Sequence, residues 1–446
     1  MFSQRHWSLL LLATGCLLAL STPQLHAVDP VVIRYWEKWA GFEADAMREI
    51  VDDFNSSQSR IFVEYSSVSQ IDRRLTLAIA GGVPPDVAGI WAYNIPVYSE
   101  NNALTPLTSM AEKAGIREDD YLPIIWKLCS HRNQLWALPS TPGNTALIYN
   151  KKLFREAGLD PERPPRTIAE LEEFNEKIFK RSANGRIERI GHLAEEPGWW
   201  NGLWGSWFGG ALIKGDSELT ATSQENLEAY RWVQSYPERF GAEDLLGMRD
   251  GFGNFASPQN AFFTGRVAMI MQGVWIYNYI QNYAPADFEW GVAPFPTNDP
   301  EKLGDVSVVE CDVLVIPHGA KHPLEAFEFI TYVNSQKNME KLCLGQRKFS
   351  PLRVCSDEFF QKHPNPHIRT FLELAKSPGA ISVPRVAVWN AINADMRNAV
   401  NLIWTGKAPA EDALQAVQER QQKALTRSAA RWERVEESLQ KSWNSQ

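Results

Sequence analysis

The N-terminal part of the sequence alternates between short β-rich runs and stretches of helical periodicity, and this alternation constrains the fold more than any other feature. Residues 31–36, 61–65 and 86–91 are rich in β-branched and aromatic residues. Between these runs, apolar residues recur at helical spacing within 46–54 and 71–79. This βαβαβ order predicts a parallel sheet covered by helices, so the expected fold class is α/β.

The ends of these predicted strands indicate where a ligand would bind. In open α/β sheets, ligands bind at the carboxyl ends of the strands. The first strand ends in Trp36, Glu37 and then Trp39, and the third ends in Trp91 with Asn94 just beyond. We therefore expect these five residues to be ligand contacts.

Length and charge narrow the class of protein. A chain of 446 residues exceeds what one hydrophobic core usually supports, so two lobes are expected. The formal net charge is −8 and no basic block occurs, so a nucleic-acid partner is not expected. The chain has 17 Trp residues, which is a high number for a side chain whose indole N–H needs a hydrogen-bond partner when it is buried.

The first 27 residues have the pattern of a secretory signal peptide. Arg5 precedes an apolar run over 7–20, and the mature chain is expected to begin near Val28 in the periplasm. Lipid attachment at Cys16 is the alternative, although the apolar run continues past this residue. No second long apolar stretch follows, so the mature chain is expected to be soluble.

The four remaining cysteines do not have the paired spacing of a zinc site, and the eight His are scattered. Neither a metal nor a cofactor is expected. Two interpretations of the thiols stay open, namely a disulfide between the pair closest in sequence and buried free thiols. These cysteines are Cys129, Cys311, Cys343 and Cys355, and the closest pair is the last two.

The middle and end of the chain carry further element signals. A Pro/Gly segment over 139–144 lies between two predicted strands and suits a crossover between lobes. Thr167 is the expected N-cap of a helix, with Glu170 as its capping-box partner. The other predicted elements are a helix ending over 262–266, strands over 267–271 and 312–317, a helix from 322 and a helical tail from 411.

Seven short stretches occur in an order that is specific for one family. They are 81–87, 136–139, 148–151, 157–167, 263–269, 273–275 and 290–296. With them the chain resembles the extracellular solute-binding proteins of ABC importers, in the sugar-binding branch that includes maltose-binding protein. The resemblance covers essentially the whole mature chain.

The resemblance implies the periplasmic-binding-protein fold of type II, with two lobes that are each a sheet flanked by helices. Hinge strands join the lobes and the ligand binds in the cleft. The expected lobes are 28–141 plus 306–355 and 142–305 plus 356–446. The resemblance also implies a monomer that is not an enzyme and that delivers its carbohydrate ligand to a membrane permease.

The resemblance further points to individual ligand contacts. Trp275 matches the position where the family stacks an aromatic ring on the sugar, and Trp389 resembles a second such position. Asn144 lies at the hinge, where the family often places a polar contact. Asn94 replaces a family carboxylate, and Gly143 replaces an acid of the maltose binders, so maltose specificity does not follow.

The chemistry of sugars points to further residues. Sugars present apolar C–H faces ringed by hydroxyls, so a site needs aromatic platforms and charged or amide partners. The spacing of Trp200, Trp204 and Trp207 places them on one helix face, in the core. The remaining candidate ligand contacts are Glu195, Glu196, Trp199, Glu310 and Asp312.

Two alternatives stay open. The same fold could bind a non-sugar solute such as a polyamine or a glycerol phosphoester, but a phosphate favours Arg or Lys at a helix N-terminus. A secreted carbohydrate-active enzyme would need two flanking carboxylates, which Glu37, Glu195, Glu196 and Glu310 could supply. The sequence has no nucleophile elbow, HExxH motif or phosphate-binding loop.

Overall fold

The computed structural model describes residues 29–196, 198–250, 252 and 256–444. The expected signal peptide and Cys16 lie outside these residues. Within the described part of the chain, no helix combines the length and the apolar character needed to cross a bilayer.

The N-terminal elements form the βαβαβ unit that the sequence predicts. Strand β1 pairs in parallel with both β2 and β3. Helix α1 turns its predicted apolar face inward, with Met47, Ile50 and Phe54 buried. The elements are β1 (Val31–Glu37), α1 (Phe42–Ser57), β2 (Ile61–Ser67), α2 (Ile71–Ala80) and β3 (Val87–Trp91).

Short elements complete this part of the molecule, which we call the N-terminal half. The hairpin of β4 and β5 leads directly into the first crossing strand. The elements are η1 (Ala92–Asn94), α3 (Ile95–Glu100), α4 (Thr108–Lys113), η2 (Glu118–Asp120), α5 (Pro123–Cys129), β4 (Ser130–His131) and β5 (Gln134–Leu135).

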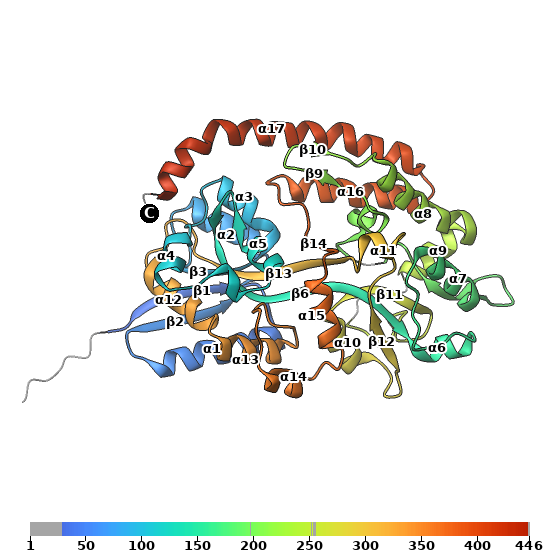
Figure 1. Ribbon diagram of the computed structural model, residues 1–446, viewed down its shortest axis with the longest axis horizontal. Helices are drawn as coiled ribbons and strands as arrows, with labels where there is room; N and C mark the ends of the chain where they lie inside the picture. Colours follow the sequence, from blue (N-terminus) through green and yellow to red (C-terminus); the bar gives the residue numbers. More distant parts are fainter. Residues whose placement is uncertain (1–28, 197, 251, 253–255, 445–446) are drawn as a thin grey trace, which may run out of the picture.

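Two long strands, β6 (Ala137–Asn150) and β13 (Ser307–Val315), run between the two sides of the molecule (Figure 1). The prediction of two strands around a Pro/Gly segment was wrong, because β6 is one continuous strand. Its first part, which contains Pro139 and Pro142, pairs with β13 alone. The two prolines lack a backbone N–H, but no second neighbouring strand needs a hydrogen bond from them there. Its last residues pair instead with β11 (Val267–Gly273) and β12 (Trp290–Ala293).

The second crossing strand also differs from its predicted bounds, since β13 begins five residues earlier than the expected 312 and ends at Val315. It pairs with β3 on one side and with β6 on the other. With β7 (Lys180–Arg181) and β8 (Ile187–His192), the sheet order is β2-β1-β3-β13-β6-β11-β8-β7. One curled sheet therefore extends through both sides.

The other side, which we call the C-terminal half, is built on β7, β8, β11 and β12. Thr167 Oγ1 accepts a hydrogen bond from Glu170 N at 3.0 Å, but the Glu170 carboxylate returns to Arg166 N rather than to Thr167 N. The elements are α6 (Lys151–Glu156), α7 (Ile168–Ile178), β7 (Lys180–Arg181), β8 (Ile187–His192), β11 (Val267–Gly273), α10 (Ile276–Tyr283), β12 (Trp290–Ala293) and α11 (Pro300–Leu303).

The predicted helix ending over 262–266 was wrong, because these residues form turns before β11. Nearby, Trp200, Trp204 and Trp207 are buried as expected, although η3 (Asn201–Phe208) is a 3₁₀ helix. Further elements of this half are β9 (Ile213–Lys214), β10 (Glu218–Leu219), α8 (Gln224–Phe240) and α9 (Ala242–Asp250).

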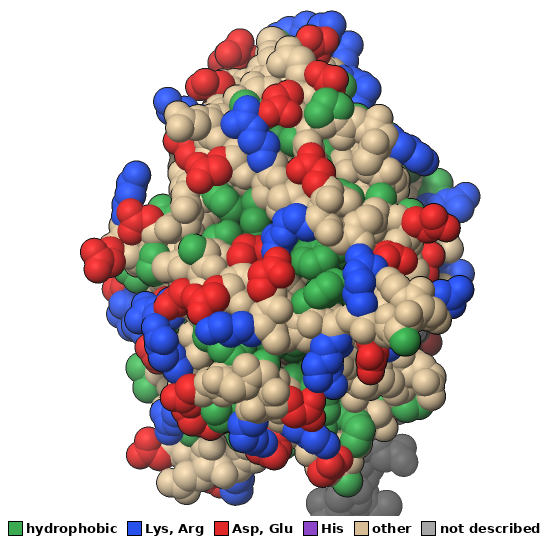
Figure 2. All heavy atoms as spheres, turned by 90° about the vertical axis from the view of Figure 1, so that its right-hand side faces the viewer, with side chains coloured by type: hydrophobic (Ala, Val, Ile, Leu, Met, Phe, Trp, Pro, Cys, Tyr) green, Lys and Arg blue, Asp and Glu red, His purple; other side chains and the backbone are tan. Residues whose placement is uncertain are grey.

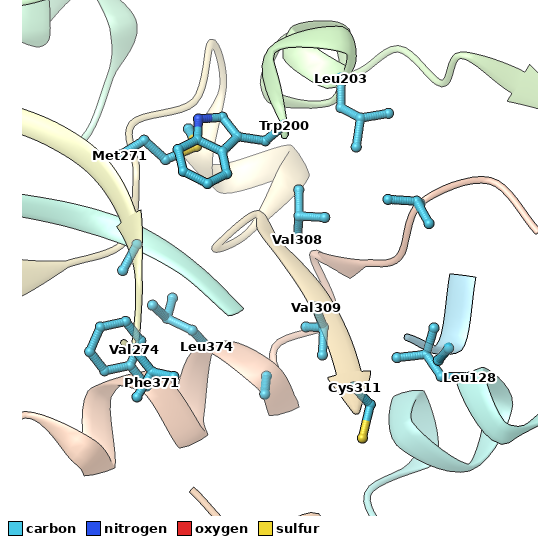
Figure 3. Close-up of a cluster of buried hydrophobic side chains, with 14 of the residues drawn as sticks. Leu128, Trp200, Leu203, Met271, Val274, Val308, Val309, Cys311, Phe371 and Leu374 are labelled. Atoms are coloured by element: carbon cyan, nitrogen blue, oxygen red, sulfur yellow. The ribbon is translucent and has the colours of Figure 1, made fainter. Parts of the chain in front are cut away.

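Buried side chains continue through the crossover without a break. In Figure 3, Val308, Val309 and Cys311 of β13 lie between Leu128 on one side and the Trp200 region on the other. The two halves therefore share apolar packing around the crossing strands.

The remaining helices pack against one half of the molecule, or against both. Helix α12 buries its predicted apolar residues, and α13 packs against α1. The elements are α12 (Pro323–Val333), α13 (Gln336–Gln346), α14 (Asp357–Lys362), α15 (Ile368–Lys376), β14 (Ala380–Ile381), α16 (Trp389–Trp404) and α17 (Ala410–Asn444).

Helix α17 spans both halves (Figure 1). Its 35 residues correspond to about 52 Å at 1.5 Å per residue. It begins against α8, where Glu411 pairs with Arg231. It ends against the N-terminal half, where Trp443 contacts Trp136 edge-to-face at 4.7 Å and donates to Asn102 Oδ1.

Cys129, Cys311, Cys343 and Cys355 are all free thiols, so the structure has no disulfide between the last two. The first three are buried, as the other interpretation expects, whereas Cys355 is half-buried. On the surface, Lys and Arg side chains alternate with Asp and Glu side chains, and neither sign forms a block on the face that Figure 2 shows.

Candidate ligand-binding cleft

A cavity of about 540 Å³ lies beside the crossing strands, and we call it the aromatic cavity. The N-terminal half contributes Trp39, Trp91 and Tyr93 to its lining. Thr141, Gly143, Glu310 and Asp312 line it from the crossing strands. From the C-terminal half come Trp199, Trp200, Trp275, Tyr279 and Trp389. Rings from both halves thus surround one space.

The rings of the N-terminal wall support one another. Trp39 and Trp91 meet edge-to-face with ring centroids 6.1 Å apart. Trp91 and Tyr93 are stacked at 6.0 Å with an interplanar angle of 8°. Trp91 ends β3 and Tyr93 lies in η1, so the strand end places both rings toward the cavity.

A cluster of buried charges adjoins the floor of the cavity, and Glu43, Asp312 and Lys348 of this cluster line it. Lys348 Nζ lies 2.9 Å from Glu43 Oε1 and 3.1 Å from Asp312 Oδ2. Lys38 Nζ lies 3.1 Å from Asp312 Oδ1 and 3.3 Å from Glu37 Oε1. The two ammonium groups therefore neutralise part of the charge of three carboxylates.

Asp312 is the centre of this cluster. Besides the two lysines, Trp39 Nε1 donates to its Oδ2 at 3.0 Å and Thr141 Oγ1 does so at 3.4 Å. Burial opposes the ionisation of Asp312, but Lys348 and Lys38 outweigh it and hold its pKa below the usual value. Its acceptor sites are occupied by protein donors, so its carboxylate positions the Trp39 ring.

Trp275 forms the opposite wall. It lies two residues beyond the end of β11, and its Nε1 donates to Gln272 Oε1 at 3.2 Å. A Cβ at Gly143 would lie 3.2 Å from Cζ3 of this ring, so a side chain at position 143 would displace the indole. Glycine at position 143 therefore lets the ring lie against β6 without a close contact.

Glu310 presents an unpaired oxygen to the same space. Its Oε1 accepts from Cys311 N at 3.1 Å and from Tyr93 N at 3.3 Å. Its Oε2 is buried and has no hydrogen-bond partner in the described part of the chain. Burial raises the pKa of Glu310 to about 7, even though Arg385 favours the charged form. Glu310 itself lines the aromatic cavity, and its Oε2 is an acceptor that the described residues leave without a donor.

The raised pKa of Glu310 predicts a specific pH dependence of folding. Between about pH 4.5 and pH 7 the folded chain keeps a proton that the unfolded chain has released, so stability falls as pH rises through this window. Glu310→Gln removes this titration. We expect the free energy of unfolding of the wild type, relative to Glu310→Gln, to fall by up to about 3 kcal/mol across the window.

The measurement is urea unfolding of both proteins from pH 4.5 to pH 8. The exposed Glu112 provides a control, because Glu112→Gln should follow the wild-type curve. Parallel curves for the wild type and Glu310→Gln would contradict the buried-acid assignment.

Seven of the candidate contacts proposed from the sequence line the aromatic cavity, and the other six do not. Glu37 lies in the interior, where Tyr35 donates to its Oε2 at 2.5 Å, and Trp36 packs against the core. Asn94 is buried and bonded to Asp72 at 3.0 Å. Asn144 is 0% exposed and donates to Ser307 and to the Phe371 carbonyl. The two remaining residues, Glu195 and Glu196, line an adjacent hollow.

Sequence reasoning did not find several lining residues. Lys348 follows Arg347, whose φ of 59° ends α13 and turns the chain toward the cavity. The α16 residues Asn390, Asn393 and Arg397 have helical spacing, which was the one signal in the sequence for a shared face. The others that sequence reasoning did not find are Glu43, Tyr93, Thr141, Gly198, Trp200, Gln272, Tyr279, Cys311 and Val383.

Comparison with known proteins gives one family and a consistent fold. A family model described as bacterial extracellular solute-binding protein matches residues 41–340. In an alignment of 420 residues that covers 89% of this chain and 91% of the relative, the chain is 21% identical to the sn-glycerol-3-phosphate-binding periplasmic protein UgpB of Pectobacterium atrosepticum.

Solved structures share the architecture. CpMnBP1 with mannobiose bound has a TM-score of 0.75 at 24% identity, with 87% of this chain and 99% of that chain covered. The sugar-binding protein MalE of Xanthomonas citri has a TM-score of 0.76 at 20% identity, with 90% and 99% covered. These similarities confirm the two-lobed α/β fold that the sequence predicts.

Proposed function

The chain belongs to the bacterial extracellular solute-binding proteins, and from this premise we propose that it captures a carbohydrate in the aromatic cavity and delivers it to the membrane permease of an ABC importer. One observation carries the proposal. Rings from both halves line a single cavity, and the polar groups between them include an unpaired carboxyl oxygen on Glu310. Aromatic faces with polar partners suit the two kinds of surface that a sugar presents.

The charges of the cavity favour a neutral ligand over a phosphoester. A phosphate needs cationic donors that are free to turn toward it. Lys348 Nζ is already held by Glu43, Asp312 and Thr141, the last at 3.3 Å. The lining holds three carboxylates against the cations Lys348 and Arg397. A glycerol phosphoester, the ligand in the name of the UgpB relatives, is therefore the second candidate.

We propose binding without chemistry. The matched family and the structural neighbours named above are binding proteins rather than enzymes. A glycosidase would need two available carboxylates that flank the bond. Asp312 is occupied by four protein donors and Glu43 by Lys348, which leaves Glu310 without an equivalent partner in the aromatic cavity.

The proposed mechanism is closure of two lobes, 28–141 plus 306–355 and 142–305 plus 356–446. A sugar that contacts both walls binds the closed form more tightly and so shifts the population toward it. The crossing strands β6 and β13 support this division, while α17 contacts both sides. We propose a periplasmic monomer that is exported through the segment 1–27.

The test is a ligand screen on the full mature chain. Glucose-, mannose-, galactose- and xylose-based saccharides are compared with glycerol 3-phosphate by thermal unfolding and calorimetry. We expect one sugar series to stabilise the protein, by about 2.7 kcal/mol at a concentration of 100 Kd, and to release no new reducing ends. Stabilisation by glycerol 3-phosphate alone would overturn the proposal, and released reducing ends would favour an enzyme.

A further inference from the structure

One face of α16 carries a continuous row of polar side chains with a single small residue in its middle. The members are Asn390, Asn393, Ala394, Arg397, Asn398 and Asn401. Their spacing of three and four residues places them on one side of the helix. From first to last the row is about 16 Å long at 1.5 Å per residue. We call this row the α16 polar face.

The α16 polar face connects two cavities. Asn390, Asn393 and Arg397 line the aromatic cavity. Ala394, Arg397, Asn398 and Asn401 line a second hollow of about 430 Å³, which we call the polar hollow. The two spaces share Arg397 and Gly198, so they adjoin each other along the helix.

The polar hollow is lined differently from the aromatic cavity. Its wall opposite α16 comes from Glu195, Glu196 and Asn201, and no aromatic residue is present among its described lining residues. At its far end, Arg249 Nη1 lies 3.2 Å from Glu195 Oε2 and 3.3 Å from Asn401 Oδ1. The acid at this end is therefore already paired with a cation.

Two buried oxygens of the wall lack partners. Glu196 is 1% exposed, and its Oε1 accepts from Met271 N, whereas its Oε2 has no hydrogen-bond partner among the described atoms. The Oδ1 of Asn201 is equally buried and, within the described residues, equally unpartnered. Burial raises the pKa of Glu196 well above its usual value and so favours its neutral carboxyl, which suits a hydroxyl.

We propose that the ligand is an oligosaccharide whose chain runs along the α16 polar face from the aromatic cavity into the polar hollow. The first units stack on rings, and the distal units are held by hydrogen bonds to Glu196, Asn201, Arg397 and Asn398. A monosaccharide bound in the aromatic cavity alone would leave the buried oxygens of Glu196 and Asn201 unsatisfied. This inference rests on the proposed carbohydrate function.

The test compares ligand length with a block at the junction. Calorimetry on the full mature chain uses the glucose-, mannose-, galactose- and xylose-based series from one to five units. Ala394 is exposed on the α16 polar face, and Ala391 is exposed on the same helix outside both cavities. Ala394→Leu therefore narrows the hollow, and Ala391→Leu is its matched control. The double variant Asn398→Ala with Asn401→Ala removes hydrogen bonds without adding bulk.

For the series that binds, we expect affinity to keep rising beyond the disaccharide. Ala394→Leu and the double variant should each weaken tetrasaccharide binding at least tenfold and change disaccharide binding less than threefold, while Ala391→Leu changes neither. The inference would be overturned if wild-type affinity stops rising at the disaccharide, or if Ala394→Leu and the double variant lose the same factor in affinity for every ligand length. Either result would leave the carbohydrate function intact. Failure of every series to bind would overturn the proposed function itself.

Discussion

Replacing Trp275 with alanine is expected to weaken sugar binding by roughly 2–4 kcal/mol, about 30- to 1,000-fold in Kd. The ring is partly exposed toward the aromatic cavity, and its position is fixed by Gln272 on its edge and by Gly143 behind it. Its removal takes away a large apolar platform that needs no reorganisation on binding.

Calorimetry with the sugar identified by the screen measures this effect. Trp126 is a partly buried tryptophan outside both cavities, so Trp126→Ala controls for the general effect of losing an indole. Trp275→Phe should recover part of the affinity, because a smaller ring still offers a face to the sugar. An unchanged Kd for Trp275→Ala would remove this residue from the site.

Lys348→Met is expected to destabilise the fold by about 3–5 kcal/mol, the cost of removing one partner from a buried ion pair. The cluster at the floor of the cavity contains two ammonium groups and three carboxylates. Without Lys348, Glu43 loses its partner at 2.9 Å and Asp312 keeps only Lys38 as a cation. The loss should shrink at low pH, because protonation relieves the uncompensated carboxylates.

Urea unfolding of the free protein gives the free energy directly. Lys341 offers a matched control, since it also lies between two acids, Asp53 at 2.6 Å and Glu49 at 3.7 Å, but at the surface. Lys341→Met should therefore cost no more than about 1 kcal/mol. Equal losses for the two variants would contradict the assignment of a buried cluster at Lys348.

The sequence was sufficient to predict the N-terminal unit and the family, because strand and helix periodicities there are undisturbed. It did not predict β6 as one strand, because Pro139 and Pro142 signal a break. The break does not occur, since that stretch of β6 pairs with β13 alone. The sequence over 262–266 was interpreted as the end of a helix, but these residues form turns before β11.

Candidate site residues could be predicted where they end strands, but the direction of each side chain could not. Successive residues of a strand point to opposite faces, so β1 buries Glu37 and turns Trp36 to its other face. Trp39 lies beyond the end of β1, where strand alternation no longer applies, and it reaches the cavity. Lys348 has no local signal at all, because a left-handed turn at Arg347 places it there. Such contacts depend on how distant segments pack.

The most direct measurement is a crystal structure of the mature chain with the bound sugar identified by the screen. The account predicts ring faces of the sugar against Trp275 from the C-terminal half and against Trp39 or Trp91 from the N-terminal half, with Glu310 bonded to a hydroxyl. A ligand bound away from these rings, or in contact with the aromatic residues of only one half, would contradict it.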